Sequence, residues 1–93
     1  MDFLTQLFKS VANERRLQIL GLLMGDKEIP LDEIAGRLKI PEATCCRNLK
    51  ILERVHLVKS HFRNGRVFYS INASSDYVNN KTIIELIGKR KSK

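Results

Sequence analysis

Residues Leu31–Ile71 read LDEIAGRLKI PEATCCRNLK ILERVHLVKS HFRNGRVFYS I. Two short helical patterns lie in this stretch, and Lys39-Ile40-Pro41 separates them because proline pushes the preceding residue out of the helical region. Two strand-like runs follow and fold back at Asn64-Gly65, a pair that accepts the positive φ angles of a tight hairpin turn. Helix, turn, helix and basic hairpin predict a winged helix-turn-helix, which places its second helix in the major groove of DNA.

The second helix of this motif has one apolar face. It is predicted to span about residues 42–55, with Cys45, Leu49 and Leu52 at i, i+4 and i+7 in one buried stripe. The helix before the turn is predicted to begin after an N-cap at Asp32. The opposite side of the second helix is then turned away from the core, and it is small, polar and cationic. Its members are Ala43, Thr44, Cys46, Arg47 and Lys50.

Apolar periodicity extends the domain on both sides of the motif. Asn13 is expected to cap a central core helix, and amphipathic patterns predict one further helix at each end of the chain. No internal repeat or linker divides residues 1–93, so we expect a single domain. The predicted fold class is mainly α with a small β-hairpin (α+β). Its parts are a first helix (1–11), the helix-turn-helix (32–55), the wing (57–71) and a last helix (77–90).

Charge is spread unevenly along the chain. The 17 Lys and Arg exceed the 10 Asp and Glu, which gives a net charge of +7. Residues 1–56 hold nine basic and eight acidic side chains (+1), and residues 57–93 hold eight and two (+6). The wing and tail therefore carry a positive field that attracts a polyanion, either nucleic acid or an acidic membrane surface.

The membrane is the weaker of these two partners. No apolar run approaches the length of a bilayer span, and Met1-Asp2 lacks the basic start of a signal peptide. We therefore expect a cytoplasmic protein with no membrane partner, in which the two cysteines are reduced.

The outward face of the second helix meets the requirements of a helix that reads DNA. Arg47 suits bidentate contact with guanine, and Thr44 and Asn48 carry groups that bond to bases or phosphates. The basic hairpin tip is expected to enter a minor groove or to grip phosphates beside it. The competing interpretations are an ordinary solvated helix face and a charged tip that only keeps the hairpin soluble. The candidate contacts with double-stranded DNA are Ala43, Thr44, Cys46, Arg47, Asn48, Lys50, Arg63, Asn64 and Arg66.

Two runs of sequence resemble those of ArsR/SmtB-type repressors. The run VANERRLQILGLL (Val11–Leu23) is similar to the second helix of that family, with Arg16 at its usual arginine. The run Leu31–Asn72 resembles its helix-turn-helix and wing, including Gly65-Arg66 and the downstream Tyr69. The resemblance covers most of the chain. It implies a homodimer built from the first and last helices, a transcriptional regulator that binds an inverted repeat, with repression as the expected effect.

The metal ligands of that family are missing. Members often carry cysteines on the helix before the turn, where Leu31–Gly36 has none, and Asp and His ligands on the last helix, where Thr82–Lys89 has no His. We therefore expect no metal sensing at these positions and no cofactor. In the second helix a common Ser-Arg-His becomes Cys46-Arg47-Asn48, and Pro41 replaces a capping serine. The preferred DNA sequence should differ accordingly.

The adjacent cysteines are the unusual chemical feature. Neighbouring helix positions point about 100° apart, so the pair cannot chelate one metal ion without distortion, and a disulfide between them would strain the backbone. Cys45 is expected to be a small core residue. Cys46 faces outward beside Arg47 and near the helix N-terminus, which favours thiolate. It is a candidate for redox control, which would need a resolving partner, and the competing interpretation is a plain contact residue.

Apolar residues of the first and last helices are the candidates for a dimer interface, with a purely intramolecular core as the competing account. They are Phe3, Leu4, Leu7, Phe8, Ile83, Ile84 and Ile87. The alternative function is a winged helix that binds protein and not DNA, with such an apolar surface as its docking face. No Ser-His-Asp, paired-carboxylate or Gly-rich phosphate arrangement stands out. No catalytic residue is therefore assigned, and an enzyme is not expected.

Overall fold

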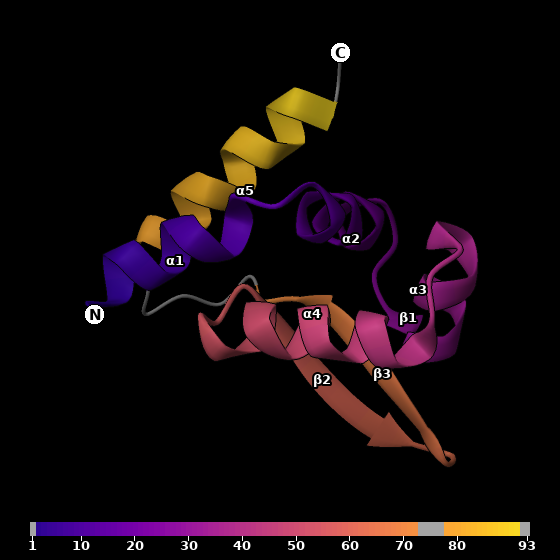
Figure 1. Cartoon of the computed structure of the whole chain (residues 1–93). Coiled ribbons are helices and arrows are strands. Elements are labelled where there is room, and N and C mark those ends of the chain that lie inside the picture. Colours follow the sequence, from indigo (N-terminus) through magenta and orange to yellow (C-terminus); the bar gives the residue numbers. More distant parts are fainter. Residues whose placement is uncertain (1, 73–77, 92–93) are drawn as a thin grey trace.

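Within residues 2–72 and 78–91, which the computed structural model describes, the chain forms five helices and three strands (Figure 1). In the last helix only the side chains of Thr82 and Ile84–Lys89 are described. This architecture confirms the predicted fold class. The elements are α1 (Phe3–Val11), α2 (Glu14–Gly25), β1 (Ile29–Pro30), α3 (Leu31–Leu38), α4 (Glu42–Arg54), β2 (Val58–Arg63), β3 (Arg66–Ile71) and α5 (Val78–Lys91).

Side chains cap the first two helices. Asp2 accepts the backbone N–H of Thr5 at 2.8 Å, and this hydrogen bond lowers the pKa of the Asp2 carboxyl. Asn13 accepts the backbone N–H of Arg16 at 3.1 Å, which confirms the predicted cap of α2. Each cap satisfies an N–H group that has no partner within its own helix.

The prediction that Asp32 caps α3 is wrong. The helix begins one residue before it, at Leu31, and Pro30 occupies the N-cap position. Proline has no side-chain acceptor, so no side-chain hydrogen bond caps this helix, but its fixed φ, here −71°, is compatible with the N-cap position. Asp32 lies instead in the first turn, where its carboxylate accepts the N–H of Glu33 at 3.1 Å and bonds to the wing.

The hairpin expected at 57–71 is joined by a third strand. β2 and β3 pair antiparallel, with Arg63 opposite Arg66 at the turn. β1 pairs with the other edge of β3, where Ile29 lies opposite Tyr69, so the strand order is β1-β3-β2. The wing, which we define as β2, β3 and their turn, is thus bonded directly to the segment that leads into α3.

Both helices of the helix-turn-helix end at a residue in the left-handed conformation. Lys39 (φ 58°) follows α3, and His56 (φ 64°) lies just beyond α4. After Lys39, the N–H of Ile40 donates back to the carbonyl of Ala35 at 3.1 Å, and an equivalent bond follows His56. Such bonds satisfy the last carbonyls of a helix and turn the chain away from its axis. They direct the chain sharply from α3 into α4 and from α4 into the wing.

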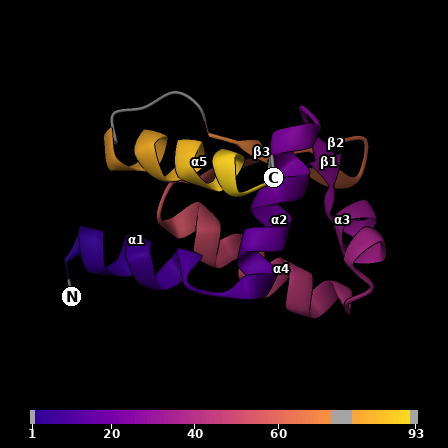
Figure 2. The same ribbon diagram turned by 90° about the horizontal axis from the view of Figure 1, so that it is seen from above.

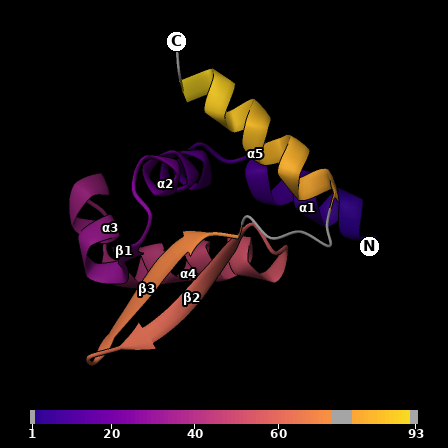
Figure 3. The same cartoon turned by 180° about the vertical axis from the view of Figure 1, so that it is seen from behind.

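One apolar core connects the layers, and α2 lies at its centre. Figure 2 shows α2 between α3 on one side and α1 and α5 on the other. Gly88 of α5 faces Met24 of α2, and a Cβ on it would lie 2.9 Å from Cε, the flexible end of the Met24 side chain, which would have to shift. Figures 1 and 3 show the tip of the wing at the end of the molecule away from α1 and α5. The largest fully buried side chains are Leu7, Ile19, Leu20, Ile29, Ile34, Leu49, Leu52, Leu57, Val58 and Cys45.

Replacing Lys39 by glycine should stabilise the protein. A side chain in the left-handed conformation costs about 1–2 kcal/mol, and glycine removes that cost while losing about 0.5–1 kcal/mol of backbone entropy. We expect the free energy of unfolding in urea to rise by about 0.5–1 kcal/mol. The control is Gln18→Gly inside α2, which should lose about 1 kcal/mol. If Lys39→Gly also lost stability, the strain assigned to Lys39 would be refuted.

Candidate nucleic-acid interface

Helix α4 buries one side completely and exposes the other. Cys45, Leu49 and Leu52 are fully buried, which confirms the predicted stripe. The exposed side chains opposite them recur at helical spacing along the whole helix, and we call this set the reading face. It consists of Ala43, Arg47, Lys50 and Arg54. Arg54 was missed in the sequence, although it lies four residues after Lys50 and seven after Arg47, which is the spacing of one helix face.

Three other candidate contacts on α4 are less exposed than the sequence suggested. Thr44, Cys46 and Asn48 are half-buried. The side-chain amide of Asn48 is held on both sides, because its Nδ2 donates to the carbonyl of Thr44 at 3.1 Å and its Oδ1 accepts from Arg16 at 2.9 Å. Asn48 therefore has less hydrogen-bonding capacity left for a base or a phosphate than a free amide has.

Arg16 connects α4 to the first helix. This half-buried side chain donates from Nη1 to Asn48 and from Nε to the backbone carbonyl of Ser10 at 2.6 Å. Ser10 lies in the last turn of α1, and its own hydroxyl donates to the carbonyl of Gln6 at 2.8 Å. The planar fork of the guanidinium thus holds two elements at once, which a single ammonium cannot do in the same geometry.

The wing is attached to the other end of α4. The hydroxyl of Ser60 in β2 donates to the carboxylate of Glu53 at 2.9 Å. The turn of the wing has Asn64 at φ 55° and Gly65 at φ 75°, as the predicted Asn-Gly hairpin requires. The wing is therefore linked to α4 by a side-chain hydrogen bond as well as by the chain itself.

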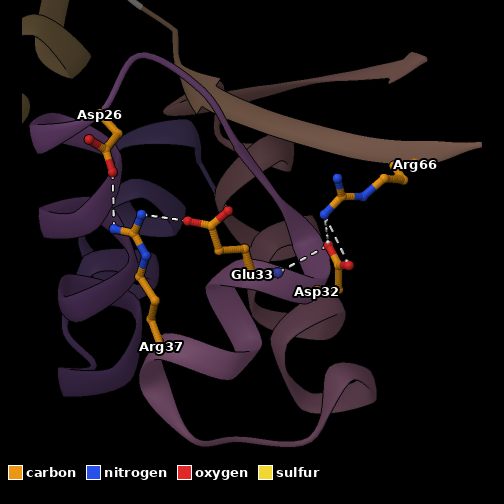
Figure 4. A network of polar contacts seen from close by, with 5 residues as sticks. All are labelled: Asp26, Asp32, Glu33, Arg37 and Arg66. Atoms are coloured by element: carbon orange, nitrogen blue, oxygen red, sulfur yellow. Dashed lines mark hydrogen bonds and ion pairs between the residues drawn. The ribbon is translucent and has the colours of Figure 1, made fainter. Parts of the chain in front are cut away.

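The arginines at the tip of the wing are paired with acids of the body. Nη2 of Arg63 lies 2.8 Å from Oε1 of Glu28. Nη2 of Arg66 lies 2.9 and 3.1 Å from the two carboxylate oxygens of Asp32, and Figure 4 shows this second pair. The hydrogen bond from Arg63 lowers the pKa of the Glu28 carboxyl, and that from Arg66 lowers the pKa of the Asp32 carboxyl. Both acids are thus ionised at neutral pH, and they offset much of the local charge that the sequence assigned to the tip.

The two cysteines differ in their surroundings. Cys45 is fully buried, and burial raises the pKa of its thiol to about 11, so it is a neutral core residue as predicted. Cys46 is half-buried, and both thiols are free. The sequence contains two cysteines, so a resolving thiol for Cys46 other than its neighbour would come from another molecule. Within residues 2–72 and 78–91 no three His, Cys, Asp or Glu side chains gather in a way that could hold a metal ion.

The candidate dimer residues divide into two groups. Leu7 (0% exposed) and Ile87 (8%) are buried within the single chain, as the competing account of an intramolecular core requires. Phe3 and Ile84 are half-buried and pack against the same core. Large exposed apolar side chains remain on α1 and α5. The two on α1 were predicted interface residues, and the one on α5 was not. They are Leu4 (45%), Phe8 (52%) and Leu86 (56%). The side chain of Ile83 lies outside the described residues.

Among the helices that the structure describes, none is long and apolar enough to cross a membrane.

Comparison with known proteins identifies the family of this chain. The helix-turn-helix domain family matches residues 11–61, a range that contains α2, α3 and α4. The chain belongs to this helix-turn-helix family. The transcriptional activator HlyU of Vibrio cholerae is 36% identical over 81 residues, which make up 87% of this chain and 70% of HlyU. The solved structure of HlyU from Vibrio cholerae has a TM-score of 0.80 and covers 98% of this chain and 94% of its own.

Two further proteins with related sequences or structures are also transcriptional regulators or DNA-binding domains. The solution structure of Mb0332 from Mycobacterium bovis, described as a homodimeric winged helix-turn-helix DNA-binding domain, has a TM-score of 0.76 and 28% identity, over 98% of this chain and 82% of that one. The transcriptional repressor SdpR of Bacillus subtilis is 25% identical over 71 residues, or 76% of this chain and 78% of SdpR. These relatives confirm the resemblance to ArsR-type winged-helix regulators that the sequence indicated.

Replacing Arg16 by lysine tests the link between α1 and α4. Lysine keeps the charge but cannot bond to Ser10 and Asn48 together, so we expect the free energy of unfolding to fall by about 1–2 kcal/mol. The matched control is Arg15→Lys on the exposed side of the same helix, which should change it by less than about 0.5 kcal/mol. Equal free energies of unfolding in urea for the two variants would show that the hydrogen bonds of Arg16 do not contribute to stability.

Proposed function

We propose that this chain is a cytoplasmic transcriptional regulator that binds double-stranded DNA specifically as a homodimer and has no catalytic role. The observation that carries the proposal is the reading face of α4, whose orientation is set by the fully buried stripe behind it. Three cationic side chains and one small residue project along this face. A helix with that composition can approach base edges closely while bonding to phosphates on both sides.

The positions along α4 suggest a role for each side chain. Ala43 lies near the N-terminal end, where its methyl group permits close approach to the groove floor and contact with a thymine methyl. Arg47 lies at mid-helix and is the candidate for bidentate bonds to guanine. Lys50 and Arg54 lie further along and suit phosphate contacts, which anchor the helix without reading sequence. Thr44 and Cys46 remain candidates for contacts at the margin of this face.

The exposed apolar residues at the opposite end support a dimer. Leu4 and Phe8 on α1 and Leu86 on α5 would be covered by a second copy. Two copies joined at α1 and α5 about a two-fold axis would present their reading faces symmetrically, as the two halves of an inverted repeat require.

Selection of duplexes from a random library by the purified chain tests both sequence preference and half-site symmetry. We expect an enriched inverted repeat. On that duplex Arg47→Ala should cost about 1–3 kcal/mol in binding and relax the preference at one base pair per half-site. Arg37→Ala is the control, because Arg37 lies on α3 and pairs there with Asp26 and Glu33. Equal losses on selected and scrambled duplexes would refute base reading by Arg47, and no enriched duplex would favour the protein-binding alternative.

The dimer is tested by placing a charge on its proposed surface. Phe8→Glu should give a monomer in sedimentation at micromolar concentration, because an unpaired carboxylate would be buried at the interface. Phe62 offers a matched control, since it is 75% exposed and lies in the wing. Phe62→Glu should remain a dimer. A monomeric wild-type chain, or dimers of both variants, would refute this interface.

A further inference from the structure

The wing arginines, Arg63 and Arg66, are held by acids that lie far from them in the sequence. Glu28 precedes β1 and is 35 residues from Arg63, and Asp32 lies in the first turn of α3, 34 residues from Arg66. Because β1 pairs with β3, the fold brings both acids against the wing. The acids and the arginines thus meet through the third strand, which local sequence patterns do not relate to the tip.

Both guanidinium groups also contact the same aromatic ring. The central carbon of Arg63 lies 4.2 Å from the centroid of Phe68, and that of Arg66 lies 5.6 Å from it. A ring face attracts a cation, so each arginine is held by a carboxylate and by a ring together. The arginine side chains nevertheless remain about half exposed, at 50% and 49%. They are restrained in the unbound protein but within reach of a ligand.

We propose that Glu28 and Asp32 determine DNA specificity, by keeping the wing arginines on the protein when the duplex is generic and releasing them only to a groove of strong negative potential. This inference rests on the proposed DNA binding. A single phosphate carries about the same charge as the carboxylate it would replace, so an ordinary backbone offers little gain from the exchange. The displaced carboxylate would also face the phosphate, and like charges repel.

A narrow minor groove changes that balance. Its two phosphate strands lie close together, and the resulting potential attracts arginine more strongly than a single backbone does. Ion pairs between exposed side chains are weak, so such a groove can break them. The wing would then add contacts on selected DNA that it withholds from other DNA, and the acids would increase the ratio between the two affinities without touching a base.

The salt dependence of binding distinguishes wing arginines that stay on their acids from wing arginines that are released to DNA. Each phosphate that the protein neutralises adds about 0.9 to the slope of log affinity against log salt concentration. Each additional phosphate contact therefore increases the loss of affinity between about 50 and 200 mM salt by about 3.5-fold. If the arginines stay on the protein when it binds generic DNA, wild-type protein should show a shallower slope on a scrambled duplex than on the selected one.

The test is the double variant Glu28→Gln with Asp32→Asn in the full chain, titrated against selected and scrambled duplexes of equal length. On the scrambled duplex, the loss of affinity between about 50 and 200 mM salt should increase roughly 10-fold, for two released arginines. Binding to this duplex at the lower salt concentration should be tighter than that of wild type. On the selected duplex the slope should not change, so discrimination between the duplexes falls.

A second pair of acids provides a charge-matched control. Asp26 and Glu33 both bond to Arg37, and Figure 4 shows Glu33 pointing toward Arg37 while Asp32 points toward Arg66. Asp26→Asn with Glu33→Gln raises the net charge equally but leaves both acids of the wing in place. It should leave the slope on the scrambled duplex near that of wild type. Arg63→Ala with Arg66→Ala, added to the first variant, should abolish its effect.

Three results would overturn the inference. The first is an equal effect of the two acid pairs, which would assign the change to net charge. The second is an unchanged salt dependence on the scrambled duplex with Glu28→Gln and Asp32→Asn. The third is weaker binding by that variant, which would mean that the acids orient the arginines for DNA. Failure of wild-type protein to bind any duplex at about 50 mM salt is a separate result. It would refute the proposed function itself.

Discussion

Burial of Cys45, Leu49 and Leu52 sets the rotation of α4 about its axis, and the rest of the surface depends on that rotation. A helix can turn its other side to solvent in only one way once these three side chains fill the core, which leaves no exposed area on any of them. The side chains of Ala43 and Arg47 then point outward because they lie on the opposite side of the helix from the buried positions. A polar residue in the stripe would disturb the core and the reading face together.

The position of α4 along its axis is set by its two ends. The left-handed residues Lys39 and His56 redirect the chain before and after the helix, so that the turn and the wing leave it at fixed angles. Ser60 then bonds to Glu53, and β1 bonds to β3, which joins the wing to α4 on one side and to α3 on the other. The helix-turn-helix and the wing are consequently one unit, stabilised by backbone geometry and hydrogen bonds as well as by apolar packing.

Local patterns in the sequence predicted most of this unit. The spacing of Cys45, Leu49 and Leu52 identified the buried face of α4, and Asn64-Gly65 identified the wing, because both signals depend on residues close together in the chain. The features that escaped prediction depend on distant partners. Asp32 has the character of an N-cap, but the fold places it against Arg66, and Asn48 resembles a free contact residue until Arg16 reaches it from another helix. Burial of Leu7 and Ile87 likewise depends on how α1 and α5 pack on the core, which apolar periodicity alone does not decide.

The two ends of the molecule have different surfaces, and Arg16 lies between them. Helices α1 and α5 expose Leu4, Phe8 and Leu86, and α4 exposes the reading face. Arg16 bonds to Ser10 in α1 and to Asn48 in α4, so α1 cannot move relative to α4 without lengthening one of these bonds or carrying the other helix with it. In a dimer joined through α1, the same bonds would transmit the position of the partner to the reading face. The separation of the two DNA-reading helices would then be set by hydrogen bonds within each chain as well as by the contact between chains.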